Sequence, residues 1–174
     1  NFGVRQDSRR KAYLYVLRRN SLAPFVPWGW SVTPEPDIRR LRDLAKPFQG
    51  WHDFSAFAKQ ASLKVSPRER YLYPIRIWPK GGLIFLFFMG NGFLHHQVRI
   101  MVGTLVRLAS NDRVGVLDGQ KLLQQMLAGQ NYVAERFTAP AQGLFLHLVY
   151  YSAAHWRRFV SLTGAETAQD LHPK

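Results

Sequence analysis

Apolar side chains recur at every second position in parts of the chain, as in a strand with one buried face. In residues 11–17, Tyr13, Tyr15 and Leu17 share a face, and this period of two predicts a β-strand. The run 83–89 is apolar throughout, which predicts a strand buried on both faces. The expected strands are residues 11–17, 70–78, 83–89 and 144–151, with a hairpin turn at 79–82.

A spacing of three to four residues between apolar positions predicts helices. In residues 37–48, Ile38, Leu41 and Leu44 form one stripe, and Gly50 follows as the expected stop. The expected helices are residues 37–48, 93–108 and 118–127, with a short helical turn at 52–57. Residues 21–36 contain four prolines and predict a loop.

Strands and helices alternate irregularly, and no repeat or linker divides the chain. This arrangement is typical of an α+β fold, with an antiparallel or mixed sheet and helices packed on one face. A length of 174 residues suits one domain. We expect that domain in residues 1–151 and a C-terminal extension in residues 152–174, with a short helix at 156–162.

The charge of the chain points to a polyanionic partner. Lys and Arg number 24 against 11 for Asp and Glu, a formal net charge of +13. Clustered cations bind phosphates and release counterions, so we favour a nucleic acid over anionic lipid or a basic protein that is merely soluble. The longest apolar run, Leu83 to Met89, is far short of the ~20 residues of a membrane-spanning helix.

Several kinds of chemistry find no support in the sequence. The chain has no cysteine, which excludes disulfides, thiolate metal sites and a cysteine nucleophile. It has no glycine-rich nucleotide loop, zinc-protease motif or serine-nucleophile motif. His95 and His96 are adjacent, and on a helix they point about 100° apart, too far to chelate one metal. We expect no metal and no cofactor.

Arg99 is the most informative charged residue. On the expected helix it shares a stripe with His95 and Gly103. Its apolar neighbours there are Val98, Met101, Val102 and Leu105. A guanidinium in such surroundings either reaches out to solvent or needs a carboxylate or phosphate partner. Gly103 has no side chain, so another backbone can approach it closely.

The run Phe93 to Gly103 resembles the motif F-L-x-x-x-V-R-x-[IM]-V-G of the TruA family of tRNA pseudouridine synthases. Further segments resemble motifs of that family in the same order, namely Phe2 to Tyr15, Gly50 to Phe57, Ser66 to Arg68 and Thr138 to Leu144. The resemblance covers about residues 2 to 151. It implies the C-terminal half of a TruA-like pseudouridine synthase fold.

The resemblance also implies an activity, the isomerisation of uridine to pseudouridine in tRNA or another structured RNA, without a cofactor. By this resemblance Tyr13 packs on the target base and Arg99 pairs with the catalytic aspartate, while Leu94 and Phe93 line the substrate pocket. That aspartate belongs to a G-R-T-D motif upstream of the strand that begins at Phe2. None of the 11 carboxylates of this chain stands in such a motif, so we expect the chain to be inactive alone.

The basic residues near these motifs are the expected RNA contacts. They are Arg5, Arg9, Arg10, Lys11, His95 and His96. The expected partner is RNA, either tRNA or rRNA, and the resemblance implies a homodimer. The alternative is a non-catalytic, TruA-like structural or assembly component of a ribonucleoprotein such as an organellar ribosome. Either role places the protein inside the cell, in the cytoplasm or the mitochondrial matrix, and no membrane is expected to take part.

Overall fold

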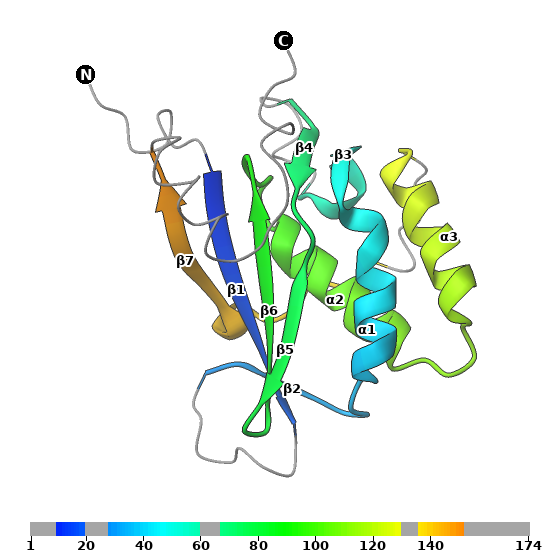
Figure 1. Ribbon diagram of the computed structural model, residues 1–174. Coiled ribbons are helices and arrows are strands. Elements are labelled where there is room, and N and C mark those ends of the chain that lie inside the picture. Colours follow the sequence, from blue (N-terminus) through cyan, green and yellow to red (C-terminus); the bar gives the residue numbers. More distant parts are fainter. Residues whose placement is uncertain (1–9, 20–27, 60–66, 130–135, 152–174) are drawn as a thin grey trace.

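The computed structural model describes residues 10–19, 28–59, 67–129 and 136–151 (Figure 1). Within these residues, short 3₁₀ turns at Lys46–Phe48, Ser55–Phe57 and Ala141–Gly143 lie between the longer elements. The strands are β1 (Arg10–Arg19), β2 (Trp30–Val32), β3 (Gly50–Asp53), β4 (Glu69–Leu72), β5 (Arg76–Lys80), β6 (Leu83–Gly90) and β7 (Leu144–Tyr150). The helices are α1 (Ile38–Ala45), α2 (Gln97–Ala109) and α3 (Val116–Leu127).

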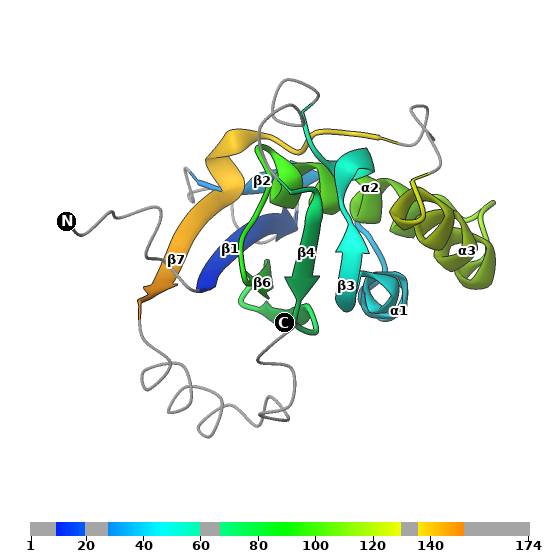
Figure 2. The ribbon, with the colours of Figure 1, turned by 90° about the horizontal axis from the view of Figure 1, so that it is seen from above.

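The strands form one mixed sheet in the order β2-β1-β6-β4-β3, with β5 on β6 and β7 on β1. β1 runs antiparallel to β6 and β7 and parallel to β2. The α+β class with a mixed sheet is therefore confirmed. Figure 2 shows the helices gathered beside the sheet, with α2 behind the central strands.

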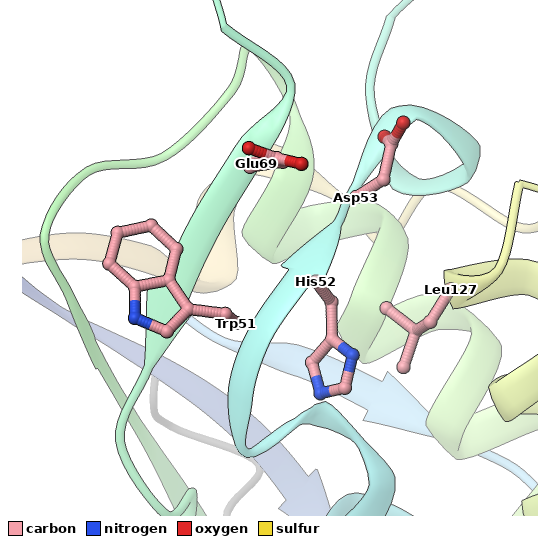
Figure 3. A pocket seen from close by; sticks show the side chains of 5 residues that line it. All are labelled: Trp51, His52, Asp53, Glu69 and Leu127. Atoms are coloured by element: carbon pink, nitrogen blue, oxygen red, sulfur yellow. The ribbon is translucent and has the colours of Figure 1, made fainter. Parts of the chain in front are cut away.

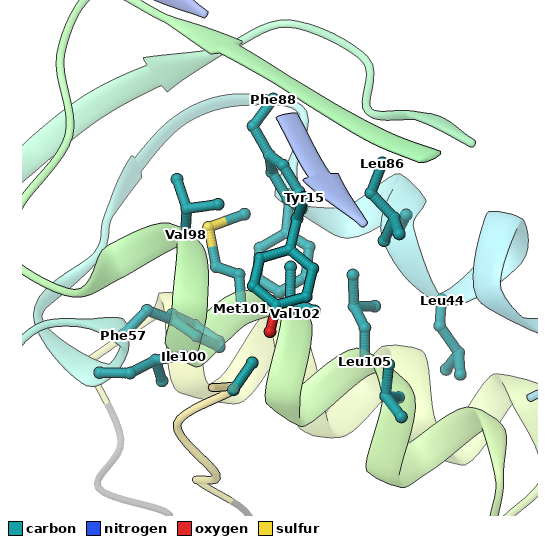
Figure 4. Close-up of a cluster of buried hydrophobic side chains, with 14 of the residues drawn as sticks. Tyr15, Leu44, Phe57, Leu86, Phe88, Val98, Ile100, Met101, Val102 and Leu105 are labelled. Carbon is teal, nitrogen blue, oxygen red and sulfur yellow. The ribbon is translucent and has the colours of Figure 1, made fainter. Parts of the chain in front are cut away.

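One core joins the three helices to one face of the sheet. Tyr15 and Leu17 of β1 lie in the same buried cluster as Leu44 of α1, Met101 of α2 and Leu123 of α3. Figure 4 shows Tyr15 directed from its strand toward α2. The predicted packing of the helices on one face agrees with this cluster.

The opposite face of β6 is less well covered than the sequence predicts. Ile84, Leu86 and Phe88 are buried, but Phe85 and Phe87 between them are only half-buried. The expectation of a strand buried on both faces is therefore wrong, because among the described residues the helices pack on a single face of the sheet.

The predicted strand 70–78 is two strands, β4 and β5. Both β4 and β5 pair with β6, and β4 also pairs with β3. The break between them contains Pro74, which has no amide hydrogen for a sheet hydrogen bond. The predicted loop 21–36 contains the short strand β2, and the helical turn expected at 52–57 is the end of β3 followed by the Ser55–Phe57 turn.

α1 is confirmed in its main part and ends sooner than expected. Asp37 begins it as predicted, since its carboxylate accepts the Arg40 backbone amide at 2.9 Å. The α-helix stops at Ala45, before Pro47, and Gly50 opens β3 with a φ of 103°. The predicted helix at 156–162 and the extension 152–174 lie outside the described residues. Within the described part, no helix is both long and apolar enough to span a membrane.

Candidate functional site

Tyr13 and Phe93 meet on the helix-bearing side of the sheet. Tyr13 is half-buried on β1, and its ring packs edge-on against Phe93 with 5.1 Å between ring centroids. Burial raises the pKa of the Tyr13 phenol above its usual value. Leu94, next to Phe93, is buried. The structure therefore brings together the three aromatic and apolar residues that the sequence assigns to one pocket.

The chain reaches α2 through an irregular turn. The helix begins at Gln97, not at Phe93 as predicted, because His96 has a positive φ of 65°, a conformation that does not continue an α-helix. The buried Gln97 side chain accepts the Leu94 amide at 2.7 Å and stabilises the turn. His95 therefore lies outside the helix and does not share a helical stripe with Arg99 and Gly103.

Arg99 is half-buried on the first turns of α2 and is anchored to the backbone of Ala139. Its Nε donates to the Ala139 carbonyl at 2.7 Å, and the Ala139 amide donates to the Arg99 carbonyl at 3.0 Å. Among the described residues, the ion pairs join other side chains: Arg19 with Glu35, Arg40 with Asp112, and Lys46 with Asp43. Within that part of the chain, no carboxylate pairs with Arg99.

Tyr15 holds the next peptide of the same segment. It is fully buried, and its hydroxyl donates to the Pro140 carbonyl at 2.7 Å. Burial raises the pKa of this phenol far above its usual value, and the nearby Arg99 guanidinium only partly opposes the shift. Tyr13 and Tyr15 share a strand face and are separated by roughly 7 Å along β1, so Tyr13 and Arg99 lie on the same side of the sheet.

Two glycines allow the segment 137–143 to approach so closely. A Cβ on Gly103 of α2 would lie 2.0 Å from the Phe137 carbonyl oxygen, and a Cβ on Gly143 would lie 2.6 Å from the Tyr15 ring. Real Cβ atoms do not approach other atoms this closely. The predicted backbone approach at Gly103 is confirmed, and Phe137 is the residue that approaches.

Basic side chains gather where the chain enters α2. The His95 and His96 rings lie 4.1 Å apart, and the Lys59 amide donates to the His95 carbonyl. Burial is the main cause that lowers the pKa of His96. The positive charges of His95, Arg99 and Lys59 lower it further. Because its pKa is lowered, His96 is uncharged at neutral pH, and the positive charge that can attract an anion here comes from Lys59 and Arg99.

The other predicted RNA contacts are not part of that group. Arg10 is buried, donates from Nε to the Tyr73 hydroxyl at 2.9 Å, and by strand alternation faces away from Tyr13. Lys11 is half-buried on β1. Arg5 and Arg9 lie outside the described residues.

A depression of about 470 Å³ that the sequence did not predict lies between β3, β4 and the end of α3 (Figure 3). Asp53, one of its lining residues, accepts the Ser55 amide at 2.7 Å, so this carboxylate stabilises the start of the Ser55–Phe57 turn. His52 contacts the Gln49 carbonyl at 2.8 Å. In the described part of the chain, no group of three or more His, Asp or Glu side chains could hold a metal ion.

Sequence reasoning missed the two backbone carbonyls that hold the site, those of Ala139 and Pro140. Both residues belong to a segment singled out for its motif, but nothing in that motif shows which atoms it offers. It also missed the hydrogen bond of Tyr15, which was treated only as one of the apolar residues on a strand face. The alternation of Tyr13 and Tyr15 was the one signal that both rings lie on the same side.

Comparison with known proteins identifies the family. A family model described as tRNA pseudouridine synthase matches residues 44–152. The chain is 36% identical over 154 residues to tRNA pseudouridine synthase A 1 of Protochlamydia amoebophila. The matched region covers 86% of the chain and 58% of that protein. It is 34% identical over 160 residues to tRNA pseudouridine synthase A of Oenococcus oeni (88% and 60%) and 35% over 154 residues to that of Lacticaseibacillus casei (87% and 60%). The chain thus spans between 58% and 60% of the length of these relatives, and it belongs to the TruA family of tRNA pseudouridine synthases.

Proposed function

We propose that this chain is the RNA-binding and arginine-bearing part of an enzyme that isomerises uridine to pseudouridine in tRNA or another structured RNA. The observation that carries the proposal is the state of Arg99. Its Nε is bound to Ala139, and no carboxylate among the described residues pairs with it. A half-buried guanidinium fixed in this way is suited to receive a carboxylate from outside the chain.

The proposed carboxylate is the catalytic aspartate of an upstream segment. Arg99 beside it keeps the carboxylate ionised, since a nearby positive charge favours the charged form. The ionised carboxylate begins the isomerisation as a nucleophile. An enzyme that acts on a base in RNA must first take that base out of the stack, and Tyr13, Phe93 and Leu94 offer an apolar and aromatic wall to receive it.

The proposed RNA contacts use the basic side chains at the entry to α2. His95, His96 and Lys59 lie together there, next to Arg99 and close to the Tyr13–Phe93 pair. Such a position suits the phosphates that flank the target nucleotide. Lys11 on β1, and Arg5 and Arg9 near it in sequence, are further proposed contacts along the RNA. Arg10 is buried and bound to Tyr73, so it is not among the proposed contacts.

The wider assembly is part of the same proposal. The resemblance to the family implies that the protein acts as a homodimer. The proposed compartment is the cytoplasm or the mitochondrial matrix. The second candidate is a non-catalytic component of a ribonucleoprotein, and the formal net charge of +13 supports it, because RNA binding by charge needs no catalytic aspartate. If no upstream aspartate completes the site, RNA binding remains without catalysis.

One experiment separates the two functions. The protein from its full reading frame and the 174-residue chain alone are each incubated with an unmodified tRNA transcript, and pseudouridine is measured by mass spectrometry. We expect product from the complete protein only, and none after its upstream aspartate is replaced by Ala. Turnover by the 174-residue chain alone contradicts the proposed role of the upstream carboxylate. A complete protein that binds RNA but yields no product supports the ribonucleoprotein component.

A further inference from the structure

Two side chains from different elements, the buried Tyr15 and the half-buried Arg99, hold successive carbonyls of one segment. The Tyr15 hydroxyl of β1 donates to the Pro140 oxygen at 2.7 Å, and Arg99 Nε of α2 donates to the Ala139 oxygen at 2.7 Å. The two acceptors belong to neighbouring residues. The Tyr15 hydroxyl, by fixing the Pro140 carbonyl, therefore also restricts the peptide group that carries the Ala139 carbonyl.

The position of Tyr15 is itself tightly determined. The side chain is fully buried over α2 (Figure 4), and a Cβ on Gly143 would lie 2.6 Å from its Cζ atom. Because burial raises the pKa of the phenol, the hydroxyl keeps its proton at neutral pH. The Pro140 carbonyl can only accept, so the direction of the hydrogen bond is fixed.

We propose that Tyr15 is a positioning residue for Arg99: by holding the Pro140 carbonyl, its hydroxyl sets the Ala139 carbonyl that orients the guanidinium. This inference rests on the proposed function, in which Arg99 pairs with a catalytic carboxylate. A guanidinium has five N–H donors in a fixed fork. With Nε–H bound to Ala139, the N–H groups of the two terminal nitrogens are the donors that a carboxylate would use.

A Tyr15 that only fills the core predicts a different result from a Tyr15 that positions Arg99. In the first case, loss of the hydroxyl lowers the stability of the protein and leaves the guanidinium in place. In the second case, the Arg99 Nε–H loses its partner and its orientation while the ring still fills the core. The variant Tyr15→Phe separates the cases because it removes one oxygen atom and keeps the ring.

The first measurement follows the Arg99 Nε–H directly. In the complete protein labelled with ¹⁵N-arginine, this signal is identified by its loss in Arg99→Lys, and its exchange with water is measured by NMR. We expect exchange at least about tenfold faster in Tyr15→Phe, since a hydrogen-bonded N–H exchanges only when the bond opens. Tyr73→Phe is the matched control, since Tyr73 is buried and hydrogen-bonded to Arg10 on the other face. Wild-type exchange at Arg99 in Tyr15→Phe overturns the inference.

The second measurement is kinetic and uses the same variants. A small misplacement of a reacting group costs up to about 100-fold in rate, so we expect Tyr15→Phe to lower kcat about 10- to 100-fold with KM within about twofold. The acid limb of the pH profile of kcat should move to higher pH, because a displaced guanidinium holds the carboxylate less firmly in its ionised form. Accelerated exchange with unchanged kcat and an unchanged acid limb contradicts the positioning role.

A second variant covers the case in which Tyr15→Phe does not fold. Gly143→Ala keeps the hydroxyl but displaces the ring from its place, and it should accelerate Arg99 exchange in the same way. Unchanged exchange in Gly143→Ala then counts against the inference. If the wild-type complete protein makes no pseudouridine, the proposed function fails, and the exchange measurement still decides whether Tyr15 positions Arg99.

Discussion

Arg99 and Ala139 are joined by two hydrogen bonds, one from the Arg99 Nε to the Ala139 carbonyl and one from the Ala139 amide to the Arg99 carbonyl. Forty residues separate them in sequence. The pair ties α2 to the segment that leads into β7, so the guanidinium is held by side chain and backbone together. In the proposed function, this anchored charge is the partner of the catalytic carboxylate.

The first prediction concerns this anchor. Arg99→Lys in the complete protein keeps a positive charge but has no planar fork to bind Ala139 and a carboxylate at once. We expect kcat to fall at least about 100-fold, as for the loss of a group that stabilises the transition state. Binding of unmodified tRNA should change by less than about threefold, since the total charge is preserved.

Arg113→Lys is the control for this substitution. Arg113 is exposed and lies beyond the other end of α2, so its replacement should leave both kcat and tRNA affinity unchanged. Steady-state kinetics and a binding titration on the two variants provide the comparison. An Arg99→Lys enzyme with wild-type kcat means that the guanidinium is not part of the catalytic machinery.

Pattern reasoning predicted the elements with clear periodicity and failed where a single residue breaks the pattern. β1 was predicted from the alternation of Tyr13, Tyr15 and Leu17, and the main part of α1 from the stripe of Ile38, Leu41 and Leu44. The apolar spacing of α2 continues without a break into Phe93 and Leu94, so no periodic signal marks the start of that helix at Gln97. The positive φ of His96 decides it, and histidine is not a residue that demands this conformation.

The site was predicted only as far as single motifs reach. Tyr13, Phe93 and Leu94 were assigned to one pocket by resemblance, and the structure brings the two rings into contact. The hydrogen bond from Tyr15 to Pro140 joins residues 125 positions apart. Contacts of this kind depend on the packing of the whole domain, and no local pattern of residues contains them.

The second prediction concerns RNA binding by charge. The affinity of the 174-residue chain for an unmodified tRNA transcript should fall steeply with salt, with a slope of log K against log salt of about −0.7 to −0.9 for each phosphate contacted. Lys59→Gln should make this slope shallower by about the amount expected for one phosphate contact. Fluorescence anisotropy between about 50 and 300 mM KCl measures both.

Arg113→Gln removes the same charge at the far end of α2 and should keep the wild-type slope. The 13 residues of α2 separate the two positions by roughly 20 Å. Equal slopes for Lys59→Gln and the wild-type chain mean that the entry to α2 does not contact phosphate. An affinity that ignores salt contradicts electrostatic binding altogether.

The third prediction tests the close packing of α2 on the segment that carries Ala139. Gly103→Ala would place a Cβ 2.0 Å from the Phe137 carbonyl oxygen, and a backbone atom cannot rotate out of the way. Overpacking of this kind costs about 3 kcal/mol, partly offset by about 1 kcal/mol from the higher helix propensity of Ala. We expect the free energy of unfolding to fall by about 2 kcal/mol in urea titrations.

Gly119→Ala in α3 is the matched control, because both glycines lie inside helices. Its added Cβ would meet Leu44 Cδ2 at 2.6 Å, the flexible end of a side chain that can move aside. The helix propensity of Ala then offsets the clash, and stability should change by less than about 1 kcal/mol. If Gly103→Ala is as stable as the wild-type protein, the segment at Phe137 does not pack on α2 in solution as described.

The last prediction is a dependence of stability on pH that arises at the entry to α2. Burial is the main cause that lowers the pKa of His96, and the charges of His95, Arg99 and Lys59 lower it further. An unfolded chain takes up this proton near pH 6.5, while the folded protein takes it up only at lower pH. Between these two values the unfolded state binds more protons, so the free energy of unfolding falls as the pH falls. The contribution of the neutral His96 to the free energy of unfolding is complete above about pH 6.5 and is lost as the pH falls below that value.

The variant His96→Asn isolates this contribution. Asn has no titrating group, and it is among the residues that tolerate the positive φ of this position. The urea midpoints of the wild-type protein and the variant are compared from about pH 7.5 to 5. Their difference should be constant above about pH 6.5. Below about pH 6.5 the midpoint of the wild-type protein should fall relative to that of the variant. His147→Asn, on β7 beside Phe87, leaves His96 in place and should keep the pH dependence that His96 contributes. If the difference stays constant over the whole range, His96 takes up its proton equally well in the folded and unfolded chain. Burial and the neighbouring His95, Arg99 and Lys59 then have no effect on its pKa.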